Sequence, residues 1–456
     1  MSEDLSYRGQ ARALLVLGIP LIGGHLAQYA IQVTDTVMLG WYGVEALAAV
    51  VLAGSLFFTI FITGAGFAFA VMPLVAAATE NGEGEVQIRR VTRMGLWISL
   101  IYTALALVPM QFSEHILRAI GQEPSLARDA ASYLRIAGWG MIPALGVMVL
   151  KSYLNALERT QIVLWVTLLA AAVNAGINYL LIFGHLGFPE MGVRGAAIAS
   201  VTVQVTSLAG LTIYALRAFP EHELFVRFWR PDWQAFAQVF RLGWPIGLTN
   251  LAEVGLFAGS AVLVGWFGTV PLAAHGIVLQ LASATFLFHL GLSNAATIRA
   301  GKALGRRDIV ALRRGGQVAI CLSLVFALVT VFVFLTWPEP LIGLFLDPDD
   351  PQKPQILAIG ITLMAMAALF QLADGAQVIA HGLLRGVQDT RVPMIISAVA
   401  YWVFGMSASY FLGVSLGYGA VGVWAGLVAG LVVAGGLLMW RFWAHSLPAL
   451  AASYDR

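Results

Sequence analysis

Residues 13–39 read ALLVLGIPLIGGHLAQYAIQVTDTVML, an apolar stretch whose only acidic or basic side chain is Asp35, apart from the neutral His25. An α-helix needs about 20 predominantly apolar residues to cross the ~30 Å hydrocarbon layer of a bilayer. A carboxylate inside such a helix is costly, by about 2.5–3.5 kcal/mol on insertion scales. The stretch therefore predicts a membrane-spanning helix that keeps one acid for a purpose.

The rest of the chain repeats this pattern. Its 456 residues are 59% hydrophobic and 11% charged, whereas soluble domains have about 25% charged residues. A transmembrane β-barrel would show alternating segments of about 10 residues, and the sequence has none. We predict an all-α polytopic membrane protein with twelve spans, at about 13–39, 46–77, 93–111, 131–154, 162–184, 194–217, 237–266, 271–299, 316–337, 355–383, 393–416 and 419–443.

The distribution of Lys and Arg predicts the orientation of the spans. Of the 26 such residues, nearly all fall on the same side of the predicted spans as the N-terminus. Only Arg118, Arg128, Arg194 and Lys353 fall on the other side, with Arg135 at the start of the fourth span. Because cytoplasmic loops carry the excess of Lys and Arg, both termini are predicted to be cytoplasmic. Arg306-Arg307 and the basic residues after them are expected to anchor this topology.

An internal repeat divides the chain into halves. Leu17-Gly-Ile-Pro20 returns as Leu242-Gly-Trp-Pro245, and Gly40-Trp-Tyr-Gly43 returns as Gly265-Trp-Phe-Gly268. Six spans per half give both halves the same orientation, as in parallel repeats about an axis along the membrane normal. We predict an N-terminal lobe at 1–217, a cytoplasmic linker at 218–236 and a C-terminal lobe at 237–456.

Three acids lie inside predicted spans: Asp35, Glu253 and Asp374. In the repeat they align with Ser260, Gln28 and Ala144, so none is duplicated. A residue needed only for the shared fold would tend to occur in both halves. The difference therefore points to chemistry, although each acid could instead be a buried structural group bonded by its neighbours.

Other polar residues share helical faces with these acids. At 100° per residue, three groups each fall within an arc of about 80° or less: His25, Gln28, Gln32 and Asp35; Thr249, Glu253 and Ser260; and Asp374, Gln377 and His381. Asn174 and Asn178 share a face at i and i+4. Polar faces avoid lipid, so these stripes should face a bundle interior or a wet cavity. The Asn pair could also be interhelical packing glue, and the histidines could simply bond carbonyls.

The sequence lacks the motifs of several common enzyme classes. The sequence contains no G-x-x-x-x-G-K-[ST], H-E-x-x-H or C-x-x-C, so it does not match the common ATPase, metalloprotease or redox patterns. We expect no enzyme activity and no bound cofactor. The slightly basic charge, +2, follows from topology and does not indicate nucleic acid.

Specific motifs then resemble a known family. Val33-Thr-Asp-Thr-Val-Met-Leu-Gly40, Leu251-Ala-Glu-Val254 and Gln371-Leu-Ala-Asp-Gly375 resemble the NorM branch of the multidrug and toxic compound extrusion (MATE) family. So do the loops Asn155-Ala-Leu-Glu-Arg-Thr160 and Arg385-Gly-Val-Gln-Asp-Thr-Arg-Val-Pro393. The resemblance covers essentially the whole chain and implies a V-shaped bundle of two pseudo-symmetric six-helix lobes.

The resemblance also implies a function and a site. It implies export of cationic or aromatic drugs and dyes, driven by inward flow of Na⁺ or H⁺ through alternating access. The family's C-lobe acids map onto Glu253 and Asp374, which would bind Na⁺ if the protein is sodium-coupled, the option we favour. The N-lobe acid maps onto Asp35, with supporting polar residues Asn174, Asn178, Gln28, Gln32, Gln377 and His381.

Two departures and one alternative accompany this assignment. Gly276 and Phe370 stand where relatives often have Gln and an aromatic hydroxyl. A flippase for a lipid-linked precursor, from the same superfamily, is the alternative function, but the charges inside the spans are acidic. We expect a monomer in the bacterial inner membrane that contacts lipid and small-molecule substrates, and no nucleic acid.

Overall fold

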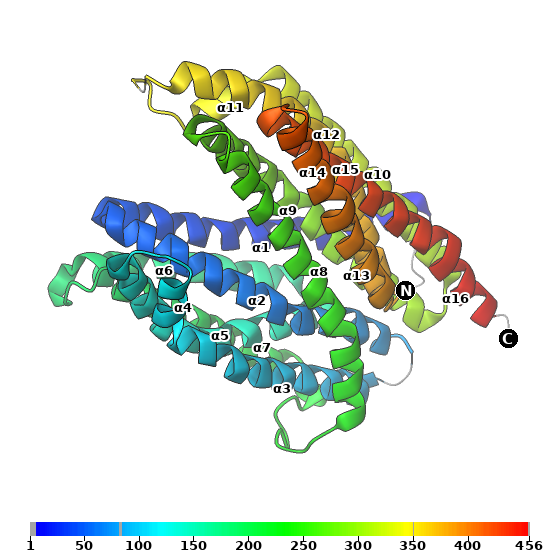
Figure 1. Cartoon of the computed structure of the whole chain (residues 1–456). Helices are drawn as coiled ribbons and strands as arrows, with labels where there is room; N and C mark the ends of the chain where they lie inside the picture. Colours follow the sequence, from blue (N-terminus) through cyan, green and yellow to red (C-terminus); the bar gives the residue numbers. More distant parts are fainter. Residues whose placement is uncertain (1–5, 82–83, 350, 455–456) are drawn as a thin grey trace. The chain divides into compact units, whose positions relative to one another are not determined.

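The computed structural model describes residues 6–81, 84–349 and 351–454. Over these residues the regular structure is helical, and twelve helical segments are long and apolar enough to cross a membrane. The all-α fold with twelve predicted spans is therefore confirmed (Figure 1). The extreme ends of the chain, which the sequence places on the cytoplasmic side, lie outside the described residues.

The first six spans are single helices. Short elements separate some of them: α4 (Ser113–Ala119) follows the third span and η1 (His185–Gly187) follows the fifth. The spans are α1 (Tyr7–Tyr42), α2 (Val44–Ala78), α3 (Gly84–Gln111), α5 (Pro124–Ala156), α6 (Thr160–Phe183) and α7 (Val193–Ala218).

The second six spans include two composite helices. The eleventh runs over 391–415 through α13 (Arg391–Ala398), η3 (Val399–Met406), α14 (Ser407–Tyr410) and η4 (Phe411–Ser415), and η3 and η4 have π-helical turns. The twelfth runs through α15 (Gly419–Trp440), η5 (Arg441–Ser446) and α16 (Leu447–Tyr454). The other four are α8 (Trp233–Gly265), α9 (Thr269–Arg306), α10 (Ile309–Thr336) and α12 (Lys353–Gly386), with α11 (Pro338–Gly343) before α12.

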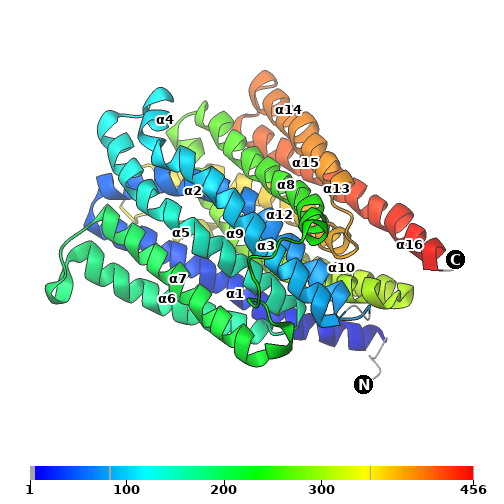
Figure 2. The same cartoon turned by 90° about the horizontal axis from the view of Figure 1, so that it is seen from below.

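The chain forms two compact units whose boundaries fall inside helices. One unit comprises residues 23–247, and the other comprises residues 1–22 together with 248–456. The first part of α1 therefore packs with the C-terminal spans, and the first part of α8 packs with the N-terminal spans. In the unit of residues 1–22 and 248–456, called the C-terminal unit below, α15 runs alongside α13 and α14 (Figure 2). Trp424 of α15 is fully buried.

Close backbone contact explains why α8 begins in the unit of residues 23–247. A Cβ built at Gly66 of α2 would lie 2.3 Å from the Gly247 nitrogen, and a Cβ at Gly247 would lie 2.3 Å from the Thr63 carbonyl oxygen. Only glycine allows two helices to approach this closely, which is a common arrangement in membrane bundles. Phe67 also stacks on Phe240, with ring centroids 5.5 Å apart.

The polar segment 219–232 is attached to α3 rather than hanging free. Arg93 donates hydrogen bonds of 2.6 Å to the carbonyl oxygens of Glu223 and Leu224, and Leu224 is buried. Trp97 Nε1 donates to the Phe228 carbonyl at 2.9 Å, and its ring stacks on the Phe228 ring. The segment lies between the end of α7 at Ala218 and the start of α8 at Trp233.

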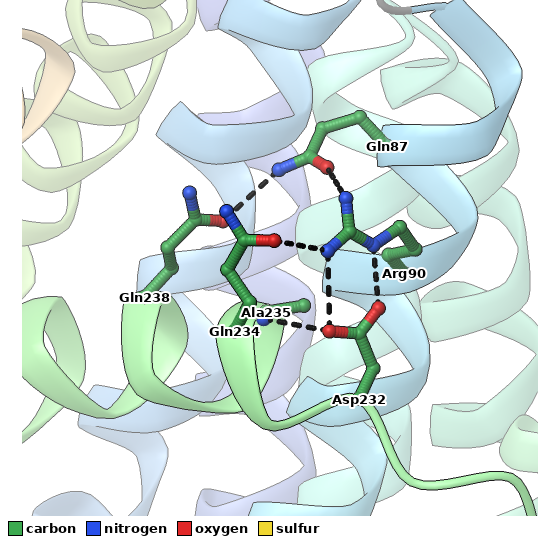
Figure 3. Close-up of polar contacts among 6 residues, drawn as sticks. All are labelled: Gln87, Arg90, Asp232, Gln234, Ala235 and Gln238. Carbon is green, nitrogen blue, oxygen red and sulfur yellow. Dashed lines mark hydrogen bonds and ion pairs between the residues drawn. The ribbon is translucent and has the colours of Figure 1, made fainter.

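At the end of this segment, Arg90 of α3 binds Asp232, the residue before α8, and Gln234 of its first turn (Figure 3). Gln87, on the same helix one turn earlier, donates to Gln238 at 3.0 Å. The connection between the two sequence halves is therefore an ordered part of the unit of residues 23–247.

Candidate functional site

The C-terminal unit contains a hydrogen-bonded chain that joins three spans. Gln377 Nε2 of α12 donates to Glu253 Oε1 of α8 at 2.9 Å. Tyr401 Oη of η3 donates to Gln377 Oε1 at 2.8 Å. The nitrogen and the oxygen of the Gln377 amide are therefore both used, and the amide is held in one orientation between an acid and a phenol. The predicted residues Glu253 and Gln377 meet directly, whereas the sequence analysis did not identify Tyr401.

Asp374 lies one helical turn before Gln377 on α12 and is 1% exposed. Its Oδ2 atom has no hydrogen-bond partner among the described residues. Three residues earlier, the side-chain nitrogen and oxygen of the fully buried Gln371 are also unpartnered within the described structure. Buried polar atoms are normally paired, so this face of α12 offers oxygens that a small cation could use.

Other polar contacts surround this chain. His381 Nε2 and Ser397 Oγ are 3.0 Å apart, which connects α12 to α13. Arg385 Nη2 donates to Asn250 Oδ1 at 3.3 Å, so the basic residue at the end of α12 lies beside α8 one turn from Glu253. The predicted stripe of Asp374, Gln377 and His381 thus faces neighbouring helices along its length.

The two departures from the family pattern have different surroundings. Phe370 is buried, and its ring makes T-shaped contacts with Phe257 and Trp424, at centroid distances of 6.0 and 5.8 Å. Trp424 in turn donates to His275 Nδ1 at 3.0 Å. A Cβ at Gly276 would meet no atom within 4 Å, so this position faces open space. Phe370 is therefore part of a packed aromatic cluster, and Gly276 is not constrained by packing.

The unit of residues 23–247 contains a second acid with its own amide partners. Asn178 Nδ2 of α6 donates to Asp35 Oδ1 of α1 at 2.5 Å and also contacts Asn174 Oδ1 at 3.2 Å. Both asparagines are fully buried, and Asp35 is partly exposed. The structure thus brings together the three residues that the sequence grouped in this half.

Two further residues of the α1 stripe lie on a face that other helices leave exposed. Gln28 and Gln32 are exposed, and the half-buried His25 precedes them. Lys151 Nζ of α5 lies 3.5 Å from Gln28 Oε1 and donates to it. The distribution of Lys and Arg places Lys151 on the predicted cytoplasmic side, and no helical periodicity links it to α1.

The two acid sites belong to different units, and each is built within its own unit. Among the described residues, no cluster of three or more His, Cys, Asp or Glu side chains could hold a metal ion. A cation at Glu253 or Asp374 would therefore need neutral oxygens from amides, hydroxyls or water as well as the carboxylates. The assignment of these residues to cation binding stays a prediction.

Comparison with known sequences identifies the family. The MatE family model matches residues 20–180 and 245–411. A probable multidrug resistance protein NorM from Rhizobium meliloti (strain 1021) is 47% identical over 443 residues, covering 96% of this chain and 94% of the relative. A protein of the same name from Agrobacterium fabrum (strain C58 / ATCC 33970) is 45% identical over 439 residues, with the same coverage.

Solved structures support the fold. The eukaryotic MATE transporter AtDTX14 superposes with a TM-score of 0.85 at 18% identity, covering 98% of this chain and 99% of that one. A MATE protein in the straight conformation superposes with a TM-score of 0.87 at 20% identity, covering 97% of both chains. The family match over both halves and the two near-full-length relatives agree with the twelve-span architecture. The chain belongs to the MatE family as a NorM-type membrane transporter and is not an enzyme.

Proposed function

We propose that this chain exports cationic and aromatic molecules from the cytoplasm across the bacterial inner membrane, in exchange for inflowing Na⁺ or H⁺. The observation that carries the proposal is the arrangement in the C-terminal unit, where Glu253, Gln377 and Tyr401 form a hydrogen-bonded chain beside the buried Asp374. The names of the relatives, probable multidrug resistance proteins, support the substrate class. The excess of Lys and Arg on one side supports cytoplasmic termini.

The chemistry follows from charge. An ionised carboxylate in a membrane helix attracts either a cationic drug or a small cation, because both offset the cost of its charge. Binding of Na⁺ or a proton at Glu253 and Asp374 removes that attraction and weakens the hold on the drug. Sodium prefers oxygen ligands, and the unpartnered Asp374 and Gln371 oxygens, with Glu253, supply them. We therefore favour Na⁺.

Alternating access then couples entry of the ion to export of the drug. A ligand shifts a conformational equilibrium only through its different affinities for the two states. In this proposal the ion binds from outside and releases the drug outward, and the transporter then opens inward and loses the ion to the cytoplasm. In this proposal the protein works as a monomer, with each acid site inside one unit of a single chain.

Ethidium efflux from cells lacking other pumps tests the proposal. Wild type and Asp374→Asn are compared in Na⁺ medium and in medium where K⁺ replaces Na⁺. The matched control is Glu339→Gln, which neutralises an exposed acid in α11 of the same unit. We expect Na⁺-dependent efflux in wild type and control, and efflux near that of empty cells in Asp374→Asn.

Other outcomes separate the alternatives. Efflux that ignores Na⁺ but stops with a protonophore would make H⁺ the coupling ion. Full ion-driven efflux in both Asp374→Asn and Glu253→Gln would refute the proposed site. Absence of efflux by wild type under any ion gradient would instead favour the flippase alternative.

A further inference from the structure

The Lys151 ammonium contacts the middle of α1, although Lys151 itself lies only three residues before the end of its predicted span, 131–154. Lys151 belongs to α5, and its Nζ atom donates to Gln28 Oε1 of α1 at 3.5 Å. Gln28 lies about fourteen residues before the end of α1 at Tyr42, which is about 21 Å at 1.5 Å per residue. With a hydrocarbon layer of about 30 Å, this position is far from the outer end of the helix. Lys151 therefore does not act only as a loop anchor.

The partners of Lys151 leave its charge uncompensated. The ammonium has three donors and no acceptor, and Gln28 is a neutral amide. Among the described residues no carboxylate lies within ion-pair distance of Lys151. A charge in a membrane span is costly unless it is paired, and ionisable residues there mark functional sites. The neutral partner thus leaves room for an anionic group from outside the protein.

The face of α1 that Lys151 contacts is exposed, and it carries the acidic residue Asp35 farther along the helix. Gln28 and Gln32 are exposed, so neighbouring helices do not cover this stripe. Asp35 lies about seven residues beyond Gln28, about 10 Å along the helix, and on the same face. Asp35 keeps its asparagine partners at Asn178 and Asn174. One exposed helical face therefore has a cationic end at Lys151 and an anionic end at Asp35.

From this juxtaposition we infer that Lys151 is a specificity-determining residue that binds an anionic group, such as a carboxylate, on transported molecules. The amine of the same molecule then points along α1 toward Asp35. The inference rests on the proposed efflux function and adds a rule to it: the protein distinguishes a zwitterion from the corresponding cation through Lys151. A lysine that only stabilised the helices would not make this distinction.

A pair of dyes with one skeleton tests the rule. Rhodamine B carries a carboxylate and a delocalised cation, and its ethyl ester carries the cation alone. Efflux of each dye is measured in cells lacking other pumps, for wild type, Lys151→Met, Lys151→Gln and Lys151→Arg. Lys353→Met, in the first turn of α12, is the matched control for loss of a lysine.

We expect the two neutral variants to lower the ratio of rhodamine B efflux to ester efflux by about tenfold, because a hydrogen bond between charged groups is worth at least that much in affinity. Lys151→Arg and Lys353→Met should keep the wild-type ratio. Binding of both dyes to the purified variants, followed by fluorescence anisotropy, should show the same change in ratio.

Each of the remaining outcomes would overturn either the role of Lys151 or the proposed efflux function. An unchanged ratio in the neutral variants, or export of the ester but not of rhodamine B by wild type, overturns the inference. Loss of both dyes in both neutral variants makes Lys151 a structural residue and also overturns it. Failure of wild type to export either dye would count against the proposed efflux function itself, so the two failures are distinguishable.

Discussion

Arg90 and Asp232 form a two-pronged ion pair that attaches the connection between the sequence halves to α3. Arg90 Nε lies 2.5 Å from Asp232 Oδ2, and Arg90 Nη2 lies 3.2 Å from Oδ1 (Figure 3). The same Oδ1 accepts the Ala235 amide at 3.0 Å, so Asp232 also caps the start of α8. The Arg90 guanidinium holds the pKa of the Asp232 carboxyl below its ordinary value. One carboxylate therefore connects the segment, α3 and α8.

The double role of Asp232 predicts a larger loss of stability than capping alone. Asp232→Ala should lower the free energy of unfolding by about 1–2 kcal/mol, since a lost cap costs about 1 kcal/mol and a partly exposed ion pair adds up to about 1 kcal/mol. The matched control is Asp308→Ala, because Asp308 caps α10 through the Ala311 amide at 2.9 Å. Thermal unfolding of the purified protein measures both. Equal losses in the two variants would show that the Arg90 contact adds nothing.

The buried His222 predicts that the segment of residues 219–232 is less stable at acidic pH. His222 lies in the same segment, 2.5 Å from Tyr153 Oη and stacked on Phe219, and it is buried. Burial lowers the pKa of His222 below its ordinary value of 6.5, partly offset by Glu221 and Glu85. The unfolded chain thus binds the proton more readily, and the free energy of unfolding falls as the pH drops below about 6.5.

This pH effect can be measured against a residue that does not titrate. The melting temperature of wild type should fall more steeply between about pH 7.5 and 5 than that of His222→Gln, because only wild type gains the proton on unfolding. Hydrogen exchange at residues 219–232, corrected for the intrinsic pH dependence of amide exchange, should show less protection at pH 5 than at pH 7.5 in wild type. Parallel melting curves for the two proteins would show that His222 does not contribute to the acid response.

The close approach of α2 and α8 predicts strong effects of one added methyl group. Gly66→Ala should destabilise the protein by about 1–3 kcal/mol, because its Cβ would clash with the backbone of Gly247 and overpacking costs that much. Gly54→Ala is the control in the same helix, since a Cβ there meets nothing within 4 Å. Thermal unfolding compares them, and an unaffected Gly66→Ala would mean that α2 and α8 can separate at little cost.

We predict that Tyr401, which is not acidic, also affects the Na⁺ dependence of efflux. Tyr401→Phe removes the hydrogen bond to Gln377 Oε1, and leaving a buried acceptor unpaired costs about 1–3 kcal/mol. Gln377 would then be freer to turn away from Glu253. We expect Tyr401→Phe to require a higher Na⁺ concentration for half-maximal ethidium efflux, whereas Tyr410→Phe, an exposed tyrosine of the same span, should not. Equal Na⁺ dependence in both variants would contradict a role for Tyr401.

The sequence was sufficient for the features that depend on local pattern. Apolar length predicted the twelve spans, because a helix that crosses a bilayer must be long and must satisfy its own backbone hydrogen bonds. The 3.6-residue period predicted that Asp374 and Gln377, or Asn174 and Asn178, share a face. Helical periodicity relates residues within one helix. It therefore predicted the polar stripes, but not which stripes lie side by side.

Only the tertiary structure decided which stripes meet and which other residues join them. Tyr401 and Lys151 carry no periodic signal, since their partners Gln377 and Gln28 lie on other helices. The unit boundaries inside α1 and α8 likewise depend on close packing, as at Gly66 and Gly247. Hydrophobicity and period are properties of single segments, whereas a hydrogen bond between helices requires that two segments be brought to the same place, and that is determined by packing of the whole chain.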